Sequence, residues 1–359
     1  MTVLDETRAP RAGEELDVAK LTAWWTDVVG PCASLTVQQF PSGHSNLTYG
    51  IEVVSNDGDV EEWVLRRPPV GAQIKNAHDM GREVRVLQAL HPVFDKVPRV
   101  LAHVDDDEVL GAPFYVMQRL RGVIVRKDFP DGFCTTDAER SRLMGGMVDT
   151  LAQLHSVDTE AAGITWGHPD GYVERQVDGW CERYAKAKTS DDAPVEEAFA
   201  WLQSHLPRPQ APTLLHNDFK LDNVVLDPDD PGHVIGVLDW EMSTRGDPLM
   251  DVGSWLAYTV EADDPPPMQM FRMMPTHLPG MGTRRSLVDN YATKSGRDVS
   301  DIVFYYAFGL CKTAVVAQQI FARFKAGKTR DKRFAHLDHA VTALAYQALN
   351  AIERGDVSA

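Results

Sequence analysis

The order of apolar and polar positions changes character about a third of the way along the chain. Before residue 121, short runs rich in β-formers are separated by turn signals such as NDGD at 56–59, a pattern typical of antiparallel strands. Apolar residues also recur at helical spacing in two stretches of this part. In order, the predicted elements are a helix over 15–29, three antiparallel strands within 34–69, a helix over 80–91 and two strands within 99–120.

Beyond residue 121, apolar residues recur three and four positions apart over long stretches, which predicts helices. The predicted helices cover 138–155, 171–188, 194–206, 251–259, 283–295, 303–323 and 334–354. Strand-like text returns only in a short β patch, in the segments around 214–227 and 233–241. A sheet-rich part followed by a helical part indicates the α+β class and not an alternating parallel α/β fold. We expect a disordered arm over 1–14, a sheet lobe over 15–118 and a helical lobe over 119–359.

Composition and charge narrow the range of partners and compartments. The 359 residues are 43% hydrophobic and 25% charged, as in ordinary globular proteins, and no run of about 20 apolar residues predicts a membrane span. The formal net charge of −16 disfavours nucleic acid and anionic membrane surfaces as partners. The charged start of the chain does not resemble a secretory signal. Four scattered cysteines without a CxxC pair indicate a reducing cytoplasm. They are Cys32, Cys134, Cys181 and Cys311.

The candidate chemistry lies in LLHNDFKLDNVVLD at 214–227, where polar residues are crowded between two apolar runs. Asn223, together with Asp239 at the end of the apolar run VIGVLD, offers the oxygen ligands that Mg²⁺ prefers. Asp218 is then free to orient or deprotonate a hydroxyl, and Lys220 offers positive charge to a transferring phosphoryl group. Lys220 as an ordinary solvated loop lysine is the alternative interpretation.

Three further polar residues are expected to have supporting roles. His216 is expected to hold the loop by hydrogen bonding, because the aspartate is the base in this chemistry. Asp247 and Asp251 are expected to brace the loop and cap the following helix. For these residues we do not expect metal binding.

The motifs HNDFKLDN, VLDWE and GDPLMDVGSWL together resemble the aminoglycoside/choline phosphotransferase family of kinase-like enzymes. FPSGHSNLTY and WVLRRPP are similar to the branch related to kinase-like domains fused to acyl-CoA dehydrogenases. The resemblance covers about residues 38–256. It implies a bilobal protein-kinase-like fold, with a small antiparallel sheet lobe containing one helix and a larger helical lobe. It also implies transfer of the γ-phosphate of ATP, with Mg²⁺, to a hydroxyl of a small molecule, with Asp218 as the base.

The same resemblance assigns nucleotide contacts in the sheet lobe. The turn PSGHSN can present backbone N–H groups near Gly43, Ser45 and Asn46 to phosphates, although a plain tight hairpin is the alternative. Arg66 occupies the position where kinases have lysine, and Glu83 fits the acid that pairs with it. Strand alternation places Val64 and Arg66 on one face and Leu65 and Arg67 on the other. The stretch FYVMQRLRG resembles the hinge that contacts adenine, through Met117, Gln118 and Arg119. An ordinary buried edge strand is the alternative.

Arginine at position 66 leaves a second function open, an inactive nucleotide- or metabolite-binding pseudokinase. A protein kinase is disfavoured, because no A-P-E segment follows Asp239. The acceptor is expected to contact 171–184 and the methionine-rich stretch 261–285, although methionines packed in the core are an equal alternative. Glu261, Asp263 and Asp264 make too sparse an acidic wall for a polycationic antibiotic, and Arg284 and Arg285 oppose them. We therefore expect a small hydroxylated metabolite, for example a partly apolar hydroxyacyl compound.

Overall fold

The computed structural model describes residues 6–41, 46–69, 80–190, 193–329 and 331–358. The chain separates into two compact units. The sheet unit comprises Met1–Ile124, Val224–Asp229 and Val234–Glu241, and the helical unit comprises Val125–Asn223, Asp230–His233 and Met242–Ala359. The sequence placed one boundary between residues 118 and 119, whereas here a later hairpin groups with the sheet unit. Among the described helices, none is both long enough and apolar enough to cross a bilayer.

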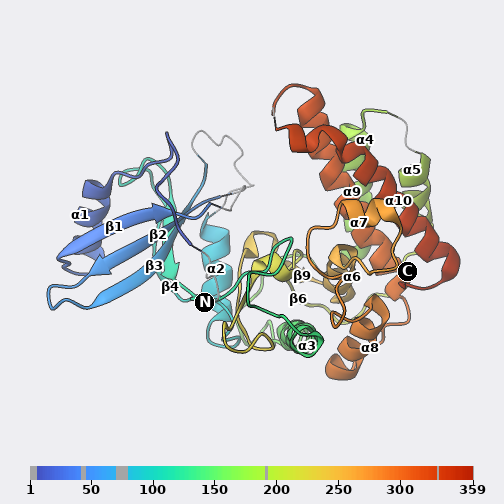
Figure 1. Ribbon diagram of the computed structural model, residues 1–359, viewed down its shortest axis with the longest axis horizontal. Helices are drawn as coiled ribbons and strands as arrows, with labels where there is room; N and C mark the ends of the chain where they lie inside the picture. The colour runs from blue at the N-terminus through green and yellow to red at the C-terminus, as the bar shows by residue number, and fades with distance from the viewer. Residues whose placement is uncertain (1–5, 42–45, 70–79, 191–192, 330, 359) are drawn as a thin grey trace. The chain divides into compact units, whose positions relative to one another are not determined.

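The sheet unit is built on five antiparallel strands in the order β1-β2-β3-β5-β4 (Figure 1). The strands are β1 (Ser34–Gln39), β2 (Leu47–Val54), β3 (Val60–Arg67), β4 (Val100–Val104) and β5 (Phe114–Gln118). The register places Leu65 opposite both Tyr49 and Val116, and it places Arg66 opposite Tyr115. Because side chains alternate across a strand, the first three residues share one face and Arg66 lies on the other. The predicted strands and their alternation are therefore confirmed.

Two helices pack on this sheet, α1 (Val18–Val28) and α2 (Met80–Leu90). The side chains of Leu21 and Trp25 on α1 join the apolar core of the face that carries Tyr49 and Leu65. Helix α2 contributes Glu83, which pairs with Arg66, so α2 lies on the opposite face. The α1 helix begins at an Asp17 cap, whose carboxylate accepts the Lys20 N–H.

Two segments distant in sequence join the sheet unit. Of the arm expected to be disordered, residues 6–14 are described, and there Arg8 pairs with Gln39 of β1. The second segment is a hairpin of β7 (Val224–Leu226) and β8 (Val234–Val237). The N–H of Val237 donates to the Lys96 carbonyl, and the Lys96 ammonium donates to the Val234 carbonyl, which ties this hairpin to the unit.

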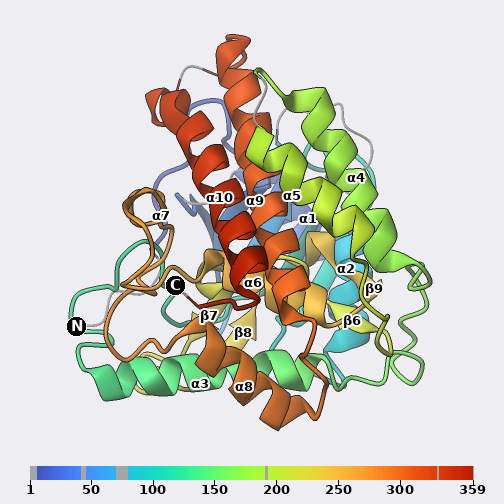
Figure 2. The ribbon, with the colours of Figure 1, turned by 90° about the vertical axis from the view of Figure 1, so that its right-hand side faces the viewer.

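The helical unit is arranged around the long apolar helix α9 (Figure 2). Helices α10, α6, α4 and α5 pack against α9, and α3 packs against α8. The helices are α3 (Asp137–Leu154), α4 (Tyr172–Ala187), α5 (Ala193–Ser204), α6 (Leu249–Tyr258), α7 (Pro266–Met270), α8 (Arg284–Ser295), α9 (Ile302–Lys325) and α10 (Leu337–Arg354). The sequence predicted all of them except α7. It also missed β9 (Thr244–Gly246), which pairs with β6 (Thr213–Leu215).

Helices α6 and α9 approach so closely that glycine is required on both. A Cβ added to Gly309 of α9 would lie 2.3 Å from the carbonyl oxygen of Gly253 on α6. A Cβ added to Gly253 would lie 2.1 Å from the carbonyl oxygen of Tyr305. Both obstacles are backbone atoms inside helices, which cannot move aside locally. The position of α6 in the unit therefore depends on these two glycines.

We predict that Gly309→Ala destabilises the helical unit by at least about 1–3 kcal/mol, the usual cost of overpacking a core. Thermal and urea unfolding followed by circular dichroism would measure the loss. Gly145→Ala in α3 is the matched control, because nothing lies within 4 Å of its added Cβ. Alanine is the better helix former there, by about 0.5–1 kcal/mol, so the control is expected to gain stability. Equal stability of the two variants would contradict the close approach.

Candidate active site

Asp218 lies in the helical unit, in the loop between buried β6 and a short 3-10 turn, Leu221–Asn223. Its Oδ2 accepts hydrogen bonds from Lys220 Nζ at 2.6 Å and from Asn223 Nδ2 at 2.9 Å. Its Oδ1 accepts from the Tyr258 hydroxyl at 3.3 Å. The carboxylate is fixed by three donors, yet its side chain remains 19% exposed, so an acceptor hydroxyl can still approach it.

Lys220 is held in place as well, unlike a solvated loop lysine. Its side chain is 13% exposed, and its ammonium lies 3.7 Å from Asp222 as well as 2.6 Å from Asp218. It also lies over the Tyr258 ring, 5.1 Å from the centroid. Burial works against the ammonium, but Tyr258 and the two carboxylates outweigh burial and raise the pKa of Lys220. Lys220 is therefore a fixed positive charge beside Asp218.

The backbone leading into Asp218 is held by the carboxylate of Asp251, on α6. Its oxygens accept the N–H of His216 at 2.6 Å and the N–H of Asn217 at 2.5 Å. Asn217 has φ of 66°, in the left-handed region that asparagine tolerates better than most residues. The Nδ1 of His216 accepts the Asp218 N–H at 3.2 Å. The predictions that Asp251 braces the loop and that His216 supports it are confirmed.

His155 completes the support behind this loop. It is fully buried, with Nδ1 2.7 Å from the Tyr291 hydroxyl and Nε2 3.3 Å from the Asp251 carboxylate. Burial lowers the pKa of His155, although Asp251 works in the opposite direction. Burial thus disfavours the protonated imidazole, which lies beside a carboxylate that accepts two backbone N–H groups.

In the sheet unit, Arg66 bridges two acids. Its Nη1 lies 2.5 Å from Glu83 and its Nη2 lies 3.0 Å from Asp239, which follows β8. The expected pair of Arg66 with Glu83 is present, and the contact with Asp239 adds a second carboxylate. Burial raises the pKa of Glu83, and Arg66 counteracts that rise. The Asp239 backbone is left-handed, with φ of 69°, and its side chain is 31% exposed.

The structure describes some of the other predicted nucleotide contacts. Gly43 and Ser45 lie outside the described residues. Asn46 is buried, and its Nδ2 donates to Glu241 at 3.1 Å. Met117 lies in β5, between β3 and β4.

At the predicted hinge, one backbone donor and one side chain already have partners. The Gln118 N–H donates to the Arg99 carbonyl at 2.8 Å, so this donor takes part in the sheet. The guanidinium of Arg119 pairs with Glu62 at 3.1 Å and lies over the Phe40 ring. Because β5 has a neighbour on each side, the alternative of an edge strand is wrong.

Three residues that contact or face Asp218, Arg66 or Asn217 were not predicted from the sequence. Tyr258 contacts Asp218, Tyr115 lies opposite Arg66, and Lys312 donates to the Asn217 carbonyl at 2.5 Å. Tyr258 lies seven residues after Asp251 and therefore on the same face of α6, a spacing that could have indicated it. Lys312 is the only charged residue in the sequence between Asp301 and Arg323, which was an unused signal.

The donor set suits a hard cation such as Mg²⁺. The Asn223 amide nitrogen donates to the Asp218 carbonyl and carboxylate, which directs its amide oxygen elsewhere. Asp239 adds a carboxylate that is partly exposed. Among the described residues, no group of three or more His, Cys, Asp or Glu is placed to hold a metal ion. Each of these two side chains offers the kind of oxygen ligand that Mg²⁺ prefers, and Mg²⁺ commonly completes its shell with other oxygens, such as those of phosphate.

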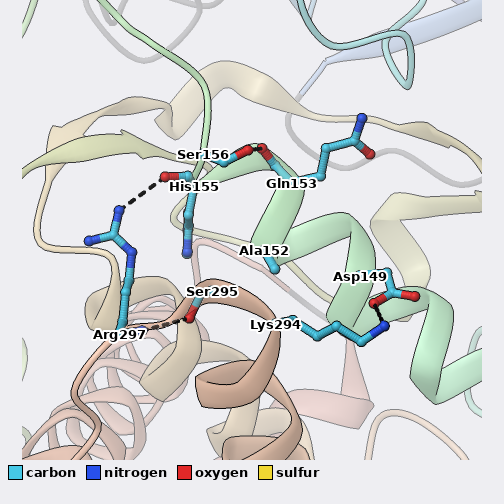
Figure 3. Close-up of a pocket in the computed structure, with 8 residues that line it drawn as sticks. All are labelled: Asp149, Ala152, Gln153, His155, Ser156, Lys294, Ser295 and Arg297. Atoms are coloured by element: carbon cyan, nitrogen blue, oxygen red, sulfur yellow. Dashed lines mark hydrogen bonds and ion pairs between the residues drawn. The ribbon is translucent and has the colours of Figure 1, made fainter.

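A pocket in the helical unit of about 380 Å³ lies beside helices α3 and α8 (Figure 3). Its walls include His155, but none of the residues predicted from the sequence as catalytic, nucleotide or metal contacts. Lys294 pairs there with Asp149 at 2.8 Å, and Arg297 donates to the His155 carbonyl at 3.0 Å. The charged side chains of Asp149, Lys294 and Arg297 therefore already have partners within the pocket wall.

The antiparallel sheet unit, the helical unit and the H-x-D loop define a kinase-like fold of the phosphotransferase class. A sequence model of the phosphotransferase enzyme family (APH) matches residues 36–285. The chain belongs to this family. A crystal structure of a candidate aminoglycoside phosphotransferase from Ralstonia eutropha aligns with a TM-score of 0.78 and 27% identity, covering 95% of this chain and 99% of that one. A choline kinase from Cryptosporidium parvum shares the fold, with a TM-score of 0.64 at 12% identity over 94% of this chain and 97% of its own.

In relatives with higher identity, the segment that matches this chain is part of a longer protein. Mouse acyl-CoA dehydrogenase family member 10 is 34% identical over 306 residues, which cover 84% of this chain and 28% of the mouse protein. Human acyl-CoA dehydrogenase family member 11 is 32% identical over 339 residues, which cover 90% of this chain and 40% of the human protein. The chain thus spans less than half the length of these curated relatives. The branch expected from the sequence is confirmed.

We predict that Arg66→Met destabilises the sheet unit by about 3–5 kcal/mol, because it leaves Glu83 buried without its cation. Hydrogen exchange of peptides from β3 and α2 would measure the loss. The double variant Arg66→Met/Glu83→Gln is the control. It removes the unpaired charge and is expected to regain most of the stability. The single variant Glu83→Gln completes the comparison: if the loss in the double variant equals the sum of the losses in the two single variants, the pair is not coupled.

We also predict an acid-sensitive stability from His155. Because burial lowers its pKa in the folded state, the unfolded state binds the proton first as pH falls below about 6.5. Stability should then decrease by up to about 1.4 kcal/mol per pH unit from this group. Urea unfolding between pH 7.5 and 5 would detect the decrease, and His155→Gln should reduce the slope. An unchanged slope in the variant would assign the acid sensitivity to other groups.

Proposed function

We propose that the protein is an ATP- and Mg²⁺-dependent phosphotransferase that moves the γ-phosphate to a hydroxyl of a small molecule. The observation that carries this proposal is the Asp218 carboxylate, which three donors hold while part of it remains open to solvent. A general base needs this combination of fixed direction and access. Membership of the phosphotransferase enzyme family supports the reaction class.

In this proposal Asp218 orients the acceptor hydroxyl and takes its proton. Tyr258 and Asn223 keep the carboxylate pointing in one direction, and Lys220 places a positive charge where negative charge develops during transfer. ATP would supply the phosphoryl group, and Mg²⁺ would neutralise charge on its phosphates. Asn223 and Asp239 would hold the metal. In support, Val224 directly follows Asn223 in the sequence and pairs with Val237, which lies two residues before Asp239.

The sheet unit would bind the nucleotide. Arg66, oriented by Glu83, would contact phosphate oxygens, and the turn at Gly43, Ser45 and Asn46 would cover them. Adenine would contact the backbone near Met117, Gln118 and Arg119. Assays with GTP in place of ATP would decide which nucleotide is the donor.

The acidic residues of 261–285 argue against a polycationic acceptor. Asp264 and Arg284 form a fully buried pair at 2.6 Å, and Glu261 lies 3.6 Å from the same guanidinium. These two carboxylates lie beside a buried guanidinium inside the protein and do not form an acidic wall for an acceptor. Of the four methionines before Pro275, Met268 and Met274 are buried, whereas Met270 and Met273 are exposed. We propose a small hydroxylated metabolite, with hydroxyacyl compounds first to test, since relatives are named as acyl-CoA dehydrogenase family members.

A non-catalytic nucleotide or metabolite binder is the second candidate. The observation that favours this candidate is that Arg66 already forms ion pairs with both Glu83 and Asp239. A nucleotide and its metal would have to compete with the Arg66–Asp239 pair. Such a protein would bind ATP without transferring phosphate. A cytoplasmic location and the absence of nucleic-acid or membrane partners remain predictions of the charge and cysteine pattern.

We predict that Asp218→Asn lowers kcat about 10²- to 10⁴-fold, the usual contribution of a general base. Asp239→Asn is expected to abolish turnover and to weaken Mg²⁺-dependent nucleotide binding. ADP release would be measured over a library of hydroxylated acids, acyl compounds and aminoglycosides. Asp27→Asn is the matched control, because this acid is exposed on α1 and lies outside the proposed site. Thermal stabilisation by ATP without turnover on any acceptor would favour the second candidate and contradict the first.

A further inference from the structure

Lys312 is a buried cation in an apolar helix. It lies in the middle of α9, between buried residues such as Cys311 and Ala314, and is itself 8% exposed. Burial lowers the pKa of its ammonium. Among the described residues, no carboxylate lies within ion-pair distance of it. A charge in this position is costly unless it performs a task that an apolar residue cannot.

The group that Lys312 contacts indicates the role of this lysine. Lys312 Nζ donates to the Asn217 carbonyl oxygen at 2.5 Å and lies 6.0 Å from the centre of the Trp180 ring, which comes from α4. The Asn217 carbonyl belongs to the peptide group whose N–H belongs to Asp218. That N–H donates to His216 Nδ1 at 3.2 Å. The peptide group that enters Asp218 is therefore held at both ends, its oxygen by Lys312 and its hydrogen by His216.

This peptide group sets the direction of the Asp218 side chain. Asn217 has the left-handed φ of 66°, and the bonds from its own N–H and side chain fix the residue but not the peptide plane that follows it. Rotation of that plane would change ψ of Asn217 and φ of Asp218 together. The carboxylate would then leave the geometry set by Lys220, Asn223 and Tyr258. A buried ammonium opposite the carbonyl resists this rotation more strongly than a neutral donor.

We propose that Lys312 is a positioning residue for the phosphotransfer reaction, which fixes the Asn217–Asp218 peptide group and through it the direction of Asp218. It acts from behind the loop through Asn217 and does not itself touch the acceptor. This inference rests on the proposed function for its kinetic consequences, but its structural consequence can be measured without turnover.

The test compares Lys312→Met, Lys312→Arg and the control Lys325→Met, which changes an exposed lysine on the same helix. Lys312→Met is expected to lower kcat about 10- to 100-fold with the KM for ATP unchanged. Lys312→Arg, which keeps the charge and donors, is expected to regain at least a third of the lost activity. Lys325→Met should match the wild type. An unchanged kcat in Lys312→Met, or a raised KM for ATP with unchanged kcat, would overturn the proposal.

Hydrogen exchange provides the readout that does not depend on activity. Peptides covering 214–221 should exchange at least 10-fold faster in Lys312→Met, while peptides from α6 and α10 keep their wild-type rates. Equal protection of the loop in variant and wild type would refute the positioning role, whatever the kinetics. Absence of turnover in the wild type, with this loop effect present, would refute the proposed function alone. If Lys312→Met does not fold, Lys312→Gln takes its place under the same criteria.

Discussion

The candidate active site depends on one buried carboxylate, Asp251. Its two oxygens accept the backbone N–H groups of His216 and Asn217, which would otherwise be unsatisfied in the interior. This arrangement allows the chain to leave β6, turn through a left-handed asparagine and present Asp218. Asp251 is carried by α6, which packs closely against α9 at Gly253 and Gly309. Helix packing and site geometry are thus linked through a single helix.

Much of the fold was predictable because its elements have strong local signals. The long helices show clear apolar periodicity, and the strands of the sheet are short runs of β-formers between turns. The elements that were missed lack such signals. Strand β9 has three residues and is defined only by its pairing with β6, and the five-residue helix α7 begins within consecutive prolines. A disordered arm was expected over 1–14 because these residues are polar and have no period, yet Arg8, in the described part of the arm, pairs with the distant Gln39.

The site was predictable where chemistry and spacing coincide, and not where support comes from distant side chains. Asp218, Lys220, Asn223 and Asp239 follow from one motif and one strand end. Tyr258 and Lys312 come from α6 and α9, and only packing brings them to the loop. The bridging role of Arg66 was also unpredictable, because a sequence does not show that one guanidinium has two carboxylates within reach. Arginine suits that role better than lysine, since its planar group presents several donors.

The buried Arg284 cluster shows why the best-known substrates of a family are a weak guide to the acceptor. Arg284 donates to Asp264, to the Thr259 carbonyl and to the Val357 carbonyl near the end of the chain. Its carboxylate partners are thus used to join the segment after α6 to the C-terminal residues. Negative charge committed in this way cannot also attract a polyamine, because a buried ion pair presents little field to solvent. The paired carboxylates Glu261 and Asp264 therefore do not indicate a cationic substrate, and the acceptor has to be inferred from the residues around Asp218.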